Sequence, residues 1–195
     1  KGEDFNKKLV WKNLSNIDIP PFFTSEDKKD YLKNTGANSQ SLINYRYIDA
    51  QTEESANKLA LKAIDEGING LLFDIKESTL VSRLLAGINL NKIAVAFLLR
   101  AHEIAFAIDF FDFVTAQKID QKNLRGYFDM ELIPNYVTKG KMNPGQCNKA
   151  AAIAELASEF PNFKAITISG ADYLDSGANQ VQEVAYTLNS LVCFI

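Results

Sequence analysis

Five short apolar runs recur along the chain at intervals of about 22 to 40 residues, and each is followed by a segment with helical spacing of apolar residues. The runs are residues 42–48, 70–75, 93–99, 124–131 and 164–169. They are almost continuously apolar, which is typical of strands that are covered on both faces. The helical patterns cover residues 56–64, 80–85, 104–114, 150–157 and 181–191. This alternation predicts serial βα units and a parallel sheet.

Right-handed βα units form either an open doubly wound sheet or a (β/α) barrel. No G-x-G-x-x-G motif follows any of the predicted strands, and no P-loop occurs in the chain. We therefore predict an α/β fold of the parallel TIM-barrel type, with about five of the eight βα units of a closed barrel. A complete barrel needs about 250 residues. The 195 residues of this chain therefore favour a truncated barrel over residues 43–195.

Residues 1–42 read as an irregular arm that precedes the predicted barrel. Thr24 and Asp27 have the spacing of a helix start, which predicts a short helix over residues 27–33. Residues 17–23 are densely apolar and contain the pair Pro20 and Pro21, which interrupts backbone pairing. Two interpretations stay open: these residues pack on their own domain, or they lie across a partner subunit.

Composition excludes several classes of protein. The formal net charge is −3 and the pI is about 5.3, which argues against nucleic acid as a partner. No apolar run approaches the roughly 20 residues of a membrane span, and no signal peptide is recognisable at the start. The two cysteines, Cys147 and Cys193, are too few for a disulfide framework. We expect a cytoplasmic protein that makes no contact with a membrane.

Charged and polar residues follow each predicted strand, where a βα barrel carries its functional groups. They are Arg46, Asp49, Asp74, Lys76, Arg100, His102, Asp129, Glu131, Ser169 and Asp172. These groups either grip a small anionic substrate or pair with one another, and pairing is the favoured interpretation. His102 suits a capping or surface role better than a general base, and Lys76 is a remote candidate for a Schiff base. One histidine and two distant cysteines predict no metal site.

Three segments carry a resemblance to a known family. Residues 168–186 contain S-G-A-D-Y followed by an acidic residue, S-G-A and an E-V-A-Y helix. This stretch resembles the S-G-Y-H, A-G-A and E-L-A-Y sequence of the methylmalonyl-CoA mutase family. The run I-P-P-F-F-T-S-E-D within residues 17–27 and the E-G-I segment within residues 65–71 resemble the same family in the same order. The resemblance implies a (β/α)₈ barrel and a radical interconversion of methylmalonyl-CoA and succinyl-CoA.

The departures from the family pattern imply a chain that is not itself catalytic. Asp172, followed by Tyr173, stands where catalytic members carry histidine, and the R-P-W stretch and the D-x-H-x-x-G cobalamin motif are absent. A carboxylate there would repel the negative charge that an imidazole stabilises on a thioester. The resemblance therefore implies the small subunit of a heterodimer, with no catalytic or cofactor-binding residues of its own. The large catalytic subunit would hold adenosylcobalamin and the CoA ester.

On this reading the arm contacts the large subunit, because exposed aromatic anchors often dominate interfaces. The interface candidates are Trp11, Pro20, Phe22 and Phe23. A truncated barrel also leaves strand edges open, which predicts self-association. The alternatives are a stand-alone TIM-barrel enzyme and an acyl-CoA-binding module, each acting on a small anionic substrate through the charges at the strand ends.

Overall fold

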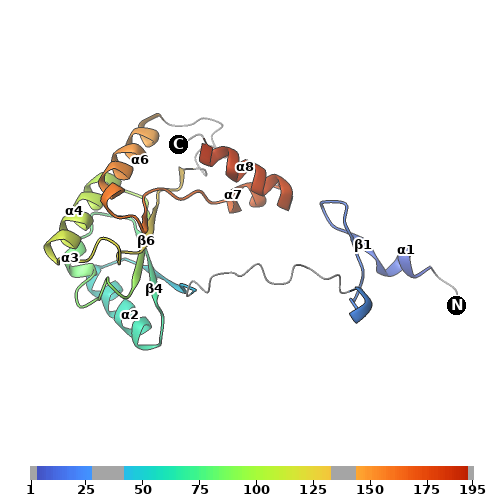
Figure 1. Cartoon of the computed structure of the whole chain (residues 1–195), viewed down its shortest axis with the longest axis horizontal. Coiled ribbons are helices and arrows are strands. Elements are labelled where there is room, and N and C mark those ends of the chain that lie inside the picture. The colour runs from blue at the N-terminus through green and yellow to red at the C-terminus, as the bar shows by residue number, and fades with distance from the viewer. Residues whose placement is uncertain (1–3, 28–41, 133–143, 193–195) are drawn as a thin grey trace.

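A computed structural model describes residues 4–27, 42–132 and 144–192 of the chain. No helix within these residues is long and apolar enough to cross a membrane. The main body is a parallel sheet flanked by helices, and a short arm precedes it in the sequence (Figure 1).

Five parallel strands form the sheet, and their order in space is their order in the chain. The strands are β3 (Tyr45–Asp49), β4 (Gly70–Ile75), β5 (Ala94–Leu99), β6 (Gly126–Asp129) and β7 (Phe163–Lys164). A doubly wound sheet reverses its strand order at a switch point, and no reversal occurs among these five strands. The predicted parallel α/β fold is confirmed, while closure into a barrel stays a prediction.

The helices of the body follow the strands one after another. They are α2 (Glu53–Asp65), α3 (Val81–Leu84), α4 (Glu103–Ala116), α6 (Pro144–Leu156), α7 (Ala171–Asp175) and α8 (Gln180–Val192). Figure 1 shows α2, α3, α4 and α6 along one face of the sheet. Alternate strand residues point toward these helices, among them Phe73, Phe97 and Phe128, and all three are fully buried. We call this the helix-covered face of the sheet.

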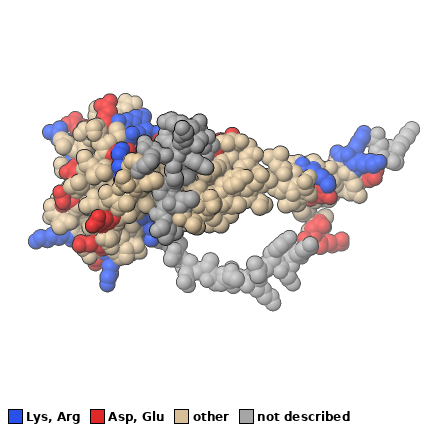
Figure 2. Space-filling view, turned by 90° about the horizontal axis from the view of Figure 1, so that it is seen from above, with Lys and Arg blue, Asp and Glu red and all other residues tan. Residues whose placement is uncertain are grey.

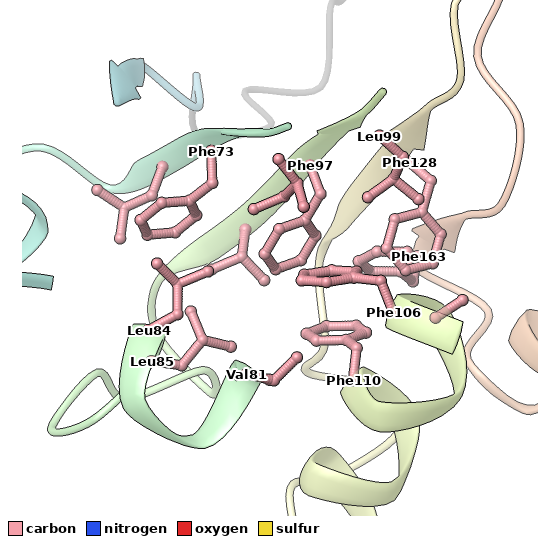
Figure 3. Packing of buried hydrophobic residues seen from close by; sticks show 14 of the residues in the cluster. Phe73, Val81, Leu84, Leu85, Phe97, Leu99, Phe106, Phe110, Phe128 and Phe163 are labelled. Carbon is pink, nitrogen blue, oxygen red and sulfur yellow. The ribbon is translucent and has the colours of Figure 1, made fainter. Parts of the chain in front are cut away.

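Phenylalanine rings dominate the core between the helix-covered face and α4 (Figure 3). The ring of Phe97 on β5 lies 4.9 Å from that of Phe106, 5.0 Å from Phe110 and 5.8 Å from Phe128, measured between centroids. Most of these pairs are edge-to-face or tilted, which is the arrangement that the charge distribution of aromatic rings favours. The apolar runs that form β4, β5 and β6 therefore each place a phenylalanine side chain in the core.

The fifth predicted strand is wrong over most of its length. Only Phe163 and Lys164 pair with β6, and residues 165–169 form no strand. The side-chain hydroxyl of Thr167 donates to the carbonyl oxygen of Phe128 at 3.0 Å. In a paired strand, a backbone N–H would donate to that oxygen instead. The partly buried Ile166 and Ile168 still pack against the core, which explains the apolar pattern.

The arm contains α1 (Phe5–Leu9), the antiparallel pair β1 (Trp11–Lys12) and β2 (Asp18–Ile19), and a 3₁₀ turn over Ser25–Asp27. Thr24 and Asp27 contact each other at this turn, where Asp27 accepts hydrogen bonds from the backbone N–H and the hydroxyl of Thr24, both at 2.8 Å. The remainder of the helix expected over residues 27–33 lies outside the described residues. Ser15 touches the body through a hydrogen bond of 3.3 Å to Gln180 on α8.

Candidate functional site at the strand ends

The carboxyl ends of the parallel strands bring charged residues from distant parts of the sequence to one edge of the sheet. Asp49 on β3 pairs in register with Asp74 on β4, and Asp74 pairs with Leu98 on β5. Leu98 is in turn opposite Asp129 on β6. Three aspartates therefore stand at the same level, as the strand-end positions in the sequence predicted.

Asp74 is the centre of this group and is only 2% exposed. Its carboxylate accepts a hydrogen bond from Nε of Arg100 at 2.8 Å and one from the hydroxyl of Tyr47 at 2.6 Å. The ammonium of Lys76 lies 3.8 Å from the same carboxylate and 3.0 Å from that of Asp49. A buried carboxylate is costly unless it is paired and hydrogen-bonded, and Asp74 meets both conditions.

Arg100 extends this network from β4 to the segment after β6. Its Nη1 lies 2.7 Å from both carboxylate oxygens of Glu131. Glu131 has a left-handed backbone with φ of 47°, and its N–H donates to Asp129 at 3.0 Å. The guanidinium thus bridges Asp74 and Glu131 across the end of β5.

The cations at this edge are engaged by the chain's own carboxylates. Hydrogen bonding to Asp49 raises the pKa of Lys76, and the same bond lowers the pKa of Asp49. A Schiff-base lysine needs a lowered pKa, so this geometry opposes that role for Lys76. Both Lys76 and Arg100 already neutralise internal carboxylates, which weakens the attraction of either side chain for an anionic substrate. The favoured interpretation, that the strand-end groups pair with one another, agrees with these contacts.

Asp172 and Tyr173 lie on α7 and face different surroundings. Asp172 lines a cavity of about 160 Å³ together with Asp129, Glu131 and Ser169. Tyr173 instead packs on α8, where its hydroxyl is 2.7 Å from that of Ser190. Residues 165–192 include no lysine or arginine, so this part of the chain brings no cation to the cavity.

Burial is the largest cause of a raised pKa at Asp129. The N–H of Glu131 and the charge of Arg100 oppose it, while Asp172 repels the ionised form. A carboxyl with a raised folded pKa binds more protons in the folded than in the unfolded chain, so its ionisation lowers stability as pH rises above about 4. The cavity therefore favours protons or cations over anions.

Asp129→Asn is expected to stabilise the fold at pH 7 by about 0.5 kcal/mol, because it removes that penalty and keeps an acceptor for the N–H of Glu131. The gain should shrink as the pH falls toward about 4, because protonation of the folded carboxyl progressively removes the penalty. Urea unfolding of both proteins at pH 4 and pH 7 measures this difference. A constant gain at both values would contradict the electrostatic explanation.

His102 lies outside this network. It is an exposed residue at the start of α4, with a left-handed φ of 54° and no hydrogen bond from its side chain to the helix end. The surface position was expected, whereas side-chain capping is not observed. No group of three or more histidine, cysteine or acidic residues within the described ranges is placed to hold a metal ion.

Tyr47 is the member of the network that the sequence did not reveal. It is followed two residues later by Asp49, and the period of two along a strand could have placed both on one face. Charged residues stand on both faces of β3, Arg46 on one and Asp49 on the other, and this concealed the alternation. The interface candidates are well exposed in three cases, at 59% for Trp11, 62% for Phe22 and 70% for Phe23, while Pro20 is half-buried.

The fold and the site define a class: a βα protein with sequential parallel strands and with internal ion pairs between the charged residues at the strand ends. The profile of the family "Methylmalonyl-CoA mutase" matches residues 65–195, two thirds of the chain. The chain therefore belongs to the methylmalonyl-CoA mutase family, and the resemblance found in the sequence is confirmed.

Two members of that family are similar to the chain. The methylmalonyl-CoA mutase small subunit of Porphyromonas gingivalis is 24% identical over 96% of this chain and 33% of its own length. The methylmalonyl-CoA mutase of Cereibacter sphaeroides is 29% identical over 64% of this chain and 18% of its own length. The chain thus spans about a third of the first relative and a fifth of the second.

Proposed function

We propose that this chain is part of the non-catalytic small subunit of a heterodimeric methylmalonyl-CoA mutase. The large subunit would carry out the isomerisation of methylmalonyl-CoA and succinyl-CoA, and the complex would be cytoplasmic. Residues 43–195 would supply the first five βα units of a barrel, and residues 1–42 would contact the large subunit. The similarity to a small subunit along 96% of the chain supports this assignment.

The main support for a non-catalytic role is that Lys76 and Arg100 form ion pairs with the chain's own carboxylates. Asp172 adds negative charge to the neighbouring cavity. An acyl-CoA substrate is an anion, and a catalytic thioester site needs hydrogen-bond donors where negative charge develops. The strand ends of this chain present mainly acceptors. The alternative of a stand-alone enzyme or acyl-CoA-binding module that grips an anion at this edge is correspondingly disfavoured.

The residues present also do not fit a corrinoid site. The chain has a single histidine, His102, which lies beside Glu77 and Asp109 and is not part of a D-x-H-x-x-G motif. Adenosylcobalamin is therefore assigned to the large subunit, and no step of the reaction is attributed to this chain. Its role is to pair with the large subunit and stabilise the assembly.

Co-expression with the large subunit tests the proposal. We expect a stable 1:1 complex whose mutase activity requires both chains and survives Asp172→Ala. Turnover or tight acyl-CoA binding by this chain alone, lost on changing Asp172 or Lys76, would show instead that the chain is itself an enzyme or a binding module. Size-exclusion chromatography of this chain alone would separately report any self-association.

Trp11→Ala and Phe22→Ala are each expected to weaken the complex with the large subunit by about 30-fold in Kd, the effect of removing an aromatic anchor from an interface. Leu59→Ala is the matched control, because Leu59 is a similarly exposed apolar residue on α2. Titration of labelled large subunit measures the affinities. Equal affinities for all three variants would exclude the arm as the main contact.

A further inference from the structure

The segments that lead into β5, β6 and β7 lie side by side at the amino end of the sheet, and we call them the amino-edge turns. They comprise residues 89–92, 118–125 and 159–164, the last of which include β7. The side-chain oxygen of Asn91 accepts hydrogen bonds from the N–H of Asp120 at 3.3 Å and from the side chain of Asn123 at 3.4 Å. Asn162 donates to the carbonyl oxygen of Lys122 at 2.7 Å. These bonds join the three segments into one surface.

Cations outnumber carboxylates on the amino-edge turns, although the net charge of the whole chain is −3. The cations are Lys92, Lys118, Lys122, Arg125 and Lys164, while the carboxylates are Asp120 and Glu159. Asp120 accepts a hydrogen bond from the N–H of Lys122 at 2.9 Å, and Glu159 accepts one from the side-chain amide of Gln121 at 3.1 Å. Both carboxylates are therefore engaged by uncharged groups of the turns, and the surface keeps a net positive charge.

The cations of the amino-edge turns also differ from most other cations of the body in their partners. Elsewhere in the body, the ion pairs within the described residues engage Arg46, Lys62, Lys76, Arg100 and Lys149. No described carboxylate lies within 4.0 Å of a cation of the amino-edge turns. The carboxyl end of the sheet thus holds internal ion pairs, whereas the amino end presents cations that the described chain does not neutralise.

Hydrogen bonds hold two of these cationic groups at the amino end of the sheet. Nη2 of Arg125 donates to the carbonyl oxygen of Lys92 at 2.6 Å, and Nζ of Lys164 donates to that of Pro161 at 3.4 Å. Lys92 and Lys122 are exposed, and the contacts described above use only their backbone atoms. Because a carbonyl oxygen does not cancel the charge of its donor, all of these side chains still attract an anion from outside the chain. Charges of one sign that gather on a surface favour a partner of the opposite sign and speed its approach.

We infer that the amino-edge turns form a docking surface for a carboxylate-rich surface of the large subunit. The inference rests on the proposed function and adds a second contact to that of the arm. The cations are spread from β5 to β7, which is two strand spacings or about 10 Å. A single phosphate group reaches donors only over hydrogen bonds of about 3 Å, so a row of carboxylates suits this spread better. The negative charge of the whole chain opposes nucleic acid as the occupant.

Charge reversal of Lys92 and Lys122 tests this surface, because their side chains make none of the contacts described above. Lys58→Glu with Arg83→Glu is the matched control, since these exposed cations on α2 and α3 also lack an ion pair within the described residues and the change in net charge is equal. At about 0.05 M salt we expect Lys92→Glu with Lys122→Glu to raise the Kd for the large subunit about tenfold, and the control to change it by less than about twofold. The difference should largely disappear at about 0.5 M salt, because salt screens exposed charges. Equal Kd values for the two double variants at low salt would overturn the inference.

A peptide titration tests the same surface without the large subunit. A short polyglutamate peptide should shift the amide NMR signals of the amino-edge turns in the whole chain, whereas a polylysine peptide of equal length should leave them unchanged. Shifts confined to other residues, or no shifts, would overturn the inference. Shifts with inorganic pyrophosphate but not with polyglutamate would also overturn it, because the surface would then hold a phosphate ligand. Failure of the proposed function would appear separately, as loss of co-purification of the unmodified chain with the large subunit.

Discussion

Gly126→Ala is expected to abolish the pairing of β5 with β6 and to cost more than about 4 kcal/mol of unfolding free energy. Gly126 has a φ of 146°, and an added Cβ would lie 1.6 Å from the carbonyl oxygen of Val95. Val95 is its register partner on β5, so the new atom would lie inside the neighbouring backbone. A backbone atom of a central strand cannot give way as a flexible side chain can. We expect a chain that is largely unfolded or aggregated.

Gly177→Ala is the matched control for this variant. Gly177 also has a positive φ, of 97°, but no atom lies within 4 Å of the position of an added Cβ. It should therefore show only the conformational cost of a left-handed residue, about 1 kcal/mol. Urea unfolding followed by circular dichroism compares the two. Equal losses would show that the backbone conformation, and not the contact with Val95, limits position 126.

Phe97→Ala should lower the unfolding free energy by about 4 kcal/mol. Phe97 is fully buried on β5, and its ring contacts those of Phe106 and Phe110 on α4 and Phe73 and Phe128 on the adjacent strands. Its removal leaves a cavity that the neighbouring rings, fixed on two strands and a helix, cannot collapse to fill. A single domain has a total stability of about 5–15 kcal/mol, so this loss is a large share of it.

Phe22→Ala is the control for Phe97→Ala, because Phe22 is an exposed phenylalanine of the arm. Its effect on the unfolding free energy should stay within about 0.5 kcal/mol. Thermal or urea unfolding of both variants provides the comparison. A loss below about 1 kcal/mol for Phe97→Ala would mean that the aromatic core repacks freely, in contradiction to the close ring contacts.

Strand-end charges pair with one another in this chain, as the proposed non-catalytic role would require. Asp74, Arg100 and Glu131 join β4 to the segment after β6, so the positions at which a catalyst would hold its substrate are engaged internally. Figure 2 shows that positive and negative side chains are interspersed over the body of the molecule. These features agree with a subunit that contributes structure to an assembly.

Some of this could be predicted from residues alone because it depends on local spacing. The run at residues 70–75 coincides with β4, and that at 93–99 begins one residue before β5. The run at 93–99 is apolar throughout and that at 70–75 is interrupted only by Asp74, so the pattern does not depend on what lies opposite. The run at 164–169 failed because its apolar residues pack against the core without pairing, and local spacing cannot distinguish these outcomes.

The sequence by itself determined the class of fold, the order of the βα units, the family and several of the charges at the strand ends. The placement of Arg46 was wrong, because it lies near the amino end of β3 and is 3.6 Å from Glu66. The tertiary structure alone decided which of these charges meet, because Asp74 and Arg100 are 26 residues apart and only strand pairing brings them together. It also decided that Tyr45 and Tyr127 touch, since that contact needs the register of four strands and the absence of a side chain at Gly70. Such pairings are non-local, and no short-range pattern records them.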